Sequence, residues 1–152
     1  MIILGLMTTI PYSAKASTQR PFNATLVTPQ SPQDCERTWI EGGIFHARNC
    51  YQSGTITGDL SGTMILSVNF NLRAAGENGP QDGTDQVKGI ITVGNEESYT
   101  ISANALFQGG VLTGRTVILG VGSSKGTFIV GELTGISDGI VQISGTLLTT
   151  NT

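Results

Sequence analysis

The one histidine of the sequence is a candidate for proton transfer. His46 has Glu41 and Arg48 nearby in the chain, and such a polar group could act as acid or base on a bound molecule. A serine hydrolase triad is not indicated, because no Gly-x-Ser-x-Gly turn is present to carry the nucleophile. A histidine on the surface or at the rim of a cavity is the plain alternative.

Tyr99 is the second candidate, because it begins a row of apolar residues at every second position. The row continues with Ile101, Ala103, Ala105 and Phe107. Two alanines among larger side chains could leave room for an apolar ligand, with the phenol of Tyr99 as its polar contact. The alternative is that the alanines face bulky residues across a packed core and leave no void.

A similar row runs through residues 62–74, with polar residues at most of the positions between. Its apolar members are Met64, Leu66, Val68, Phe70 and Leu72. This alternation predicts a strand with one face turned inward. It leaves open whether that face fills a core or lines a cavity, and Phe70 is therefore a further ligand-binding candidate.

Cys35 and Cys50 are the only two cysteines, and we expect them to form a disulfide. The bridge would close a loop of about 15 residues and contribute roughly 3 kcal/mol to stability. A metal or redox pair is disfavoured, because there is no Cys-x-x-Cys and one histidine cannot complete a ligand set. We expect no metal site and no cofactor.

Three acidic residues lie in or next to a glycine-rich segment at 75–84. Glu77, Asp82 and Asp85 lack the regular spacing that gathers carboxylates around calcium. We therefore expect residues 75–84 to form a long solvated loop.

The elements that must position these residues are strands. Apolar alternation recurs about every dozen residues between glycine-rich turns, and no helical period follows residue 16. The sequence predicts an all-β domain: an eight-stranded antiparallel up-and-down β-barrel, with a two-sheet β-sandwich as the alternative. Closure is favoured by glycines within or beside strands, such as Gly89 and Gly145, because they let strands bend tightly.

The domain boundaries follow from the first residues. An apolar run from Ile2 to Ile10, then Pro11 and Ala14-Lys15-Ala16, indicates that residues 1–16 are a truncated signal peptide. A first core strand is the alternative; nine residues are too few for a membrane span, which needs about twenty. We expect residues 17–21 to be linker, residues 22–152 a single barrel, and the protein to be secreted or periplasmic.

The charge balance bears on partners. The formal net charge is −3, and no run of basic residues occurs. A protein that binds a phosphate backbone needs a positively charged surface, so nucleic acid is not an expected partner. A small apolar ligand is an expected partner, and a homo-oligomer is compatible with the sequence.

Three runs resemble the allene oxide cyclase-like barrel superfamily, which includes plant dirigent proteins and secreted bacterial proteins. They are GDLSGT at 58–63, GTDQVKGIITV at 83–93 and the glycine-rich stretch at 110–148. The resemblance implies an eight-stranded barrel that can hold a small apolar molecule. Val121 replaces the second glycine of that family's V-x-G-G-T-G turn, and no acidic residue can be carried over as a catalytic group, so the catalytic residues are unknown.

Three functions remain, in order of preference. The first is a secreted barrel that binds a small hydrophobic molecule. The second is an isomerase or cyclase in which Tyr99 or His46 steers a bound ligand. The third is a solid barrel with a structural or adhesive surface. The sequence does not decide whether the protein is an enzyme.

Overall fold

The computed structural model describes residues 17–29, 34–74 and 81–150, and almost all of them lie in strands. The strands are β1 (Ser17–Val27), β2 (Asp34–Glu41), β3 (Ile44–Gly58), β4 (Gly62–Ala74), β5 (Gln81–Val93), β6 (Glu96–Gln108), β7 (Val111–Gly120), β8 (Thr127–Ser137) and β9 (Ile140–Thr150). Within the described ranges the only helical element is a single 3-10 turn, η1 (Gly122–Ser124).

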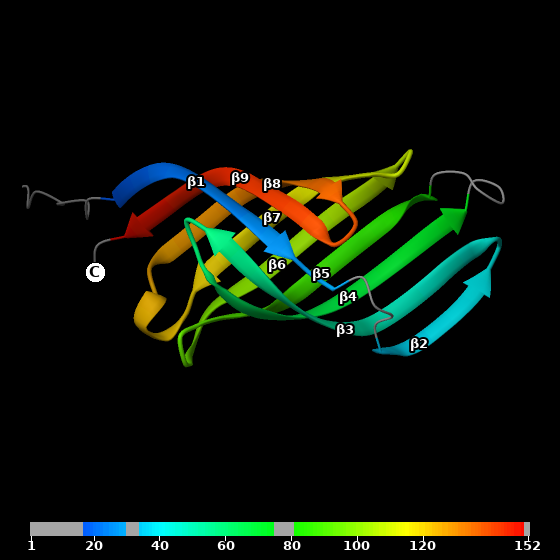
Figure 1. Ribbon diagram of the computed structural model, residues 1–152, viewed down its shortest axis with the longest axis horizontal. Coiled ribbons are helices and arrows are strands. Elements are labelled where there is room, and N and C mark those ends of the chain that lie inside the picture. Colours follow the sequence, from blue (N-terminus) through cyan, green and yellow to red (C-terminus); the bar gives the residue numbers. More distant parts are fainter. Residues whose placement is uncertain (1–16, 30–33, 75–80, 151–152) are drawn as a thin grey trace, which may run out of the picture.

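The nine strands form one antiparallel sheet in the order β1-β9-β8-β7-β6-β5-β4-β3-β2. A further pairing joins β1 to β3, from Ala24 opposite Gly58 to Val27 opposite Thr55, and closes eight of the strands into a ring. β2 lies outside this ring and pairs only with β3, as Figure 1 shows. The prediction of an up-and-down barrel is confirmed, with an additional strand that pairs with β3 beyond the ring.

The inward face is set by the alternation of side chains along each strand. In β6, Ile101, Ala103 and Ala105 are buried, while Thr100 and Ser102 between them are exposed. One face of an antiparallel strand thus packs inside the ring and the other faces solvent, as expected for a half-buried strand.

Close approach between β8 and β9 depends on two glycines that are opposite each other. Gly131 and Gly145 are register partners. A Cβ atom at Gly145 would collide with the backbone oxygen of Val130 and the Cα of Gly131. Glycine at this position therefore lets the two strands bend together around the ring.

One half of the interior is solid. Seven large side chains there are almost completely inaccessible: Phe22, Ile56, Met64, Ile91, Ile118, Ile129 and Ile143. They come from seven strands of the ring, so this single cluster joins almost the whole barrel by burial of apolar surface.

Two predicted boundaries are wrong. Residues 17–21, expected to be linker, are the first part of β1 and pair with β9 from Ser17 opposite Thr150 to Pro21 opposite Thr146. Their backbone groups pair with β9 although their side chains are exposed, so no apolar alternation marks them as a strand. β5 begins at Gln81, and only residues 75–80 of the expected loop remain, which lie outside the described residues. The predicted signal peptide at 1–16 also lies outside them.

The disulfide is confirmed: Cys35 of β2 is bonded to Cys50 of β3. It ties the outer strand to the ring next to a bulge in β3 between Ala47 and Cys50, where Asn49 has a positive φ of 50°. β3 is continuous through this bulge. No helix in the described ranges is long and apolar enough to cross a membrane.

Candidate functional site

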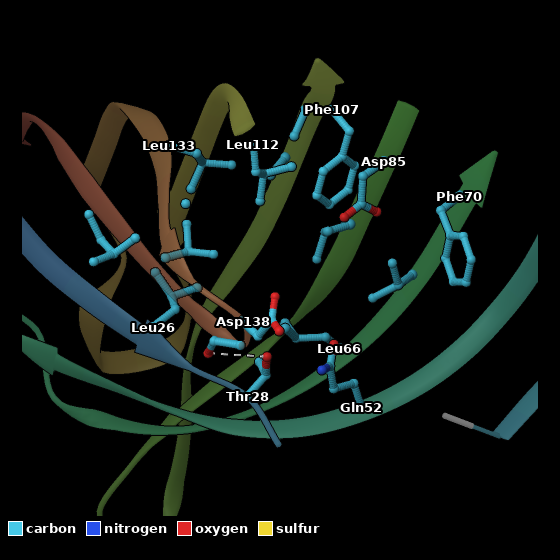
Figure 2. A pocket seen from close by; sticks show the side chains of 18 of the residues that line it. Leu26, Thr28, Gln52, Leu66, Phe70, Asp85, Phe107, Leu112, Leu133 and Asp138 are labelled. Carbon is cyan, nitrogen blue, oxygen red and sulfur yellow. Dashed lines mark hydrogen bonds between the residues drawn. The ribbon is translucent and has the colours of Figure 1, made fainter. Parts of the chain in front are cut away.

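The half of the barrel that is not solid holds a cavity of about 710 Å³ (Figure 2). Its walls are mainly apolar side chains from strands around the ring. The apolar lining residues are Leu26, Leu66, Val68, Phe70, Leu72, Val87, Ile101, Ala103, Ala105, Phe107, Leu112, Leu133, Ile136 and Val141. A cavity of this size and character is typical of sites for small apolar molecules.

The inward row of β4 is divided between the two halves. Met64 is fully buried in the solid core, whereas Leu66, Val68, Phe70 and Leu72 line the cavity. The sequence left core and cavity open for this row, and the strand contributes to both. Phe70 and Leu72 are less buried than Met64, because they lie toward the open end of the cavity.

Four of the predicted ligand-binding residues line the cavity together: Phe70, Ala103, Ala105 and Phe107. Ala103 and Ala105 are buried but extend little beyond the sheet. Gly135 of β8 also lies in the wall and has no side chain. These small residues leave space that larger side chains would fill.

Asp85 contributes a carboxyl group to this mainly apolar wall. It belongs to β5, where it is opposite Phe70 of β4 and Ala105 of β6. Figure 2 shows its carboxylate beside the Phe107 ring and directed into the cavity. The Oδ1 atom is buried and has no hydrogen-bond partner among the described residues.

Burial raises the pKa of Asp85 from 3.8 to about 6, because an apolar environment disfavours the charged form. A hydrogen bond from the backbone of Gln86 acts in the opposite direction and is too weak to cancel this effect. Asp85 therefore gains or loses its proton close to neutral pH, and perturbed carboxyls in cavities are candidates for functional groups.

The other polar lining groups lie near the turn between β8 and β9. Thr28, just after β1, donates its backbone N–H to the oxygen of Gly139 at 2.7 Å. Gln52 of β3 donates its side-chain Nε2 to the oxygen of Pro29 at 3.3 Å. These bonds hold the end of β1 against its neighbours and shape this side of the cavity. Asp138 lies in the same turn, and its side chain is exposed.

Tyr99 does not line the cavity, although its side chain is on the inward face. It is opposite Ile91 of β5 and Gly120 of β7, at the solid end of the barrel, and packs against the core. The alternation along β6 predicted its face correctly. It did not indicate at which end of the barrel the space would lie.

His46 is also away from the cavity, on the outer face of the wall. Its ring stacks on Trp39 of β2, with ring centroids 4.7 Å apart. Its Nδ1 is 2.6 Å from Oδ1 of Asn71. An amide oxygen only accepts, so this contact is a hydrogen bond in the tautomer that has a proton on Nδ1. Asn71 lies between the cavity residues Phe70 and Leu72 in β4, so its side chain is on the opposite, outward face of the strand.

Two arginines complete this outer cluster. Arg48 donates to the same Asn71 oxygen at 2.8 Å and also to the backbone oxygens of Ala47 and Phe70. The Arg37 guanidinium lies 4.5 Å from the centre of the Trp39 ring, a cation–π arrangement. His46 is thus one member of a hydrogen-bonded and stacked cluster that attaches β2 to β3 and β4.

Asp85 is the site residue that sequence reasoning missed. From the sequence it was considered only with Glu77 and Asp82, as one of three acidic residues in or next to the glycine-rich segment whose spacing does not fit calcium. One signal in the sequence could have found it. An alternating row on one face of the strand consists of Asp85, Val87, Gly89 and Ile91. A strand that begins before Asp85, as β5 does, therefore places its carboxyl on the inward face.

No group of three or more potential metal-ligating side chains occurs in the described part of the chain. The arrangement that is present can hold an apolar molecule and offers it one carboxyl group of altered pKa. No protein-family model matches the sequence, and no curated protein is significantly similar to it.

Proposed function

We propose that this protein is a secreted β-barrel that binds a small hydrophobic molecule in its cavity. The observation that carries the proposal is the 710 Å³ space lined mainly by apolar side chains. A barrel whose only role is structural gains stability by filling such a space, since each unfilled void costs free energy. The disulfide supports secretion, because such bonds persist in oxidising compartments.

The binding test uses N-phenyl-1-naphthylamine, an apolar dye that fluoresces in apolar surroundings. We expect saturable binding by the wild-type protein and at least a ten-fold loss of affinity in Ala103→Phe, whose added ring occupies the cavity. The control is Ser102→Phe, which places the same ring at the next, outward position of β6. The absence of saturable binding, or equal losses in both variants, contradicts the proposal.

A second function, isomerisation or cyclisation of the bound molecule, is favoured by Asp85. A carboxyl with a pKa of about 6 in an apolar cavity can exchange a proton with a ligand near neutral pH. Tyr99 and His46 lie elsewhere, so Asp85 takes the role first considered for them. The test is to identify by native mass spectrometry the molecule retained on purification, and to follow its conversion by wild type and Asp85→Asn. Equal conversion by both proteins contradicts a role for this carboxyl.

A relationship to the allene oxide cyclase-like superfamily is part of the same proposal. It rests on the glycine turns of residues 110–148 and is compatible with the ring of eight strands.

A further inference from the structure

Among the described residues, the charged side chains that line the cavity are all acidic. They are Asp85 and Asp138, and no lysine, arginine or histidine is among the described lining residues. Asp138 is exposed in the turn between β8 and β9, whereas Asp85 extends from the middle of the apolar wall. From the described lining residues, a ligand in the apolar part of this space meets the carboxyl group of Asp85 and no basic side chain.

The basic side chains of the neighbouring strands do not compensate for Asp85. Lys88 of β5, Arg73 of β4 and Arg115 of β7 are exposed and occupy outward positions of the sheet. On β5 itself, Asp82 is exposed and accepts a hydrogen bond from the backbone of Gly109 at 2.9 Å. β6 offers only the neutral Asn104 and Gln108 near this level.

The backbone of Gln86 is the only hydrogen-bond donor that the described residues provide to this carboxylate, and it does not cancel the effect of burial. Its Oδ1 atom has no hydrogen-bond donor among the described residues, and the cavity supplies no cation. Buried charges are stable when they are paired and hydrogen-bonded. At neutral pH the group is mostly ionised, since its pKa is about 6. The missing partner is a positively charged hydrogen-bond donor.

We infer that the cavity selects apolar amines: molecules whose hydrocarbon part fills the space between Phe70 and Leu133 and whose protonated nitrogen donates to Oδ1 of Asp85. This inference rests on the proposed binding function and adds the ligand class to it. Fatty acids, the common anionic ligands of apolar cavities, are rejected, because their carboxylate would meet Asp85 with no cation to neutralise either group.

The test compares three probes with the same ten-carbon chain: decylamine, decanol and decanoate. Isothermal titration calorimetry at pH 7.5 should show decylamine binding at least about ten-fold more tightly than decanol, because charge-assisted hydrogen bonds are stronger than neutral ones. Decanoate should bind more weakly than decanol. In Asp85→Asn the ratio of the decylamine affinity to the decanol affinity should fall to about one.

Two controls separate pairing at Asp85 from general attraction to a negatively charged protein. Glu132→Gln removes the same charge from an exposed, outward position of β8 and should leave the preference unchanged. Lowering the pH from 7.5 to 5 should weaken decylamine binding, because Asp85 becomes protonated, and should leave decanol binding unaltered.

The outcomes distinguish the two proposals. If decanol binds but decylamine has no advantage, or if Asp85→Asn keeps that advantage, the amine inference is wrong and the binding function stands. If decanoate binds as tightly as decylamine, the inference is also wrong. If none of the three probes binds, the binding function fails, and the inference fails with it.

Discussion

Asp85 of β5 is directly opposite Ala105 of β6 in the sheet, and both side chains line the cavity. The pair places a group that can be charged beside one of the smallest side chains of the wall. A larger residue at position 105 would occupy the space next to the carboxyl, so the small neighbour keeps Asp85 accessible to a ligand.

Replacing Asp85 by asparagine should stabilise the protein at high pH. The pKa of Asp85 is 3.8 in the unfolded chain and about 6 in the folded protein. As the pH rises through this interval, the unfolded chain loses the proton more readily than the folded protein, so the free energy of unfolding of the wild type decreases. At pH 8 the variant should be more stable by about 2 to 3 kcal/mol, from roughly 1.4 kcal/mol for each pKa unit. Below pH 4 the difference should vanish.

Urea unfolding of wild type and variant at pH 3.5, 6 and 8 measures this difference. Glu132→Gln, on the exposed side of β8, is the control and should show no comparable trend. A variant that is equally stable or less stable at pH 8 would contradict the burial of an unpaired carboxylate.

Ala105→Leu distinguishes a cavity from a packed core. Position 105 borders the cavity, so the added methyl groups have space, and we expect a loss below about 1 kcal/mol in the free energy of unfolding. The matched control is Ala24→Leu on the inward face of β1, outside the cavity wall, where overpacking should cost about 1 to 3 kcal/mol. Thermal unfolding measures both, and equal losses would indicate that the interior is packed throughout.

Removal of the disulfide should affect β2 before the ring. β2 pairs only with β3, and the bond between Cys35 and Cys50 attaches the beginning of β2, far from the turn that joins the two strands. In the Cys35→Ala/Cys50→Ala double variant, we expect faster hydrogen exchange in β2, with a loss of up to about 3 kcal/mol in global stability. Unchanged protection of the β2 amides would show that the outer cluster around Trp39 is sufficient to hold the strand.

Gly145→Ala should be among the most damaging small substitutions. Its new Cβ atom would overlap backbone atoms of β8, which cannot move without disturbing the sheet. We expect a loss of more than about 2 kcal/mol in the free energy of unfolding. Gly94→Ala, in the open turn between β5 and β6, should cost about 1 kcal/mol, because only its φ of 64° opposes alanine. A smaller effect at position 145 than at position 94 would contradict the close approach.

Local patterns in the sequence predicted most of the strands, the inward rows of β4 and β6, and the disulfide. Alternation is a local property, so it assigned the inward rows of β4 and β6 without knowledge of the other strands, and two cysteines have a single way to pair. Residues 17–21 escaped this reasoning, because exposed side chains on both faces of a strand leave no alternation to detect.

Only the tertiary structure decided where the space lies and which residues share it. Tyr99 and Ala105 are on the same face of β6, yet one packs in the solid end and the other borders the cavity. That difference depends on the side chains that the other strands of the ring place at each end of the barrel. The pKa of Asp85 is raised for the same reason, because its burial arises from strands that come together only when the barrel closes.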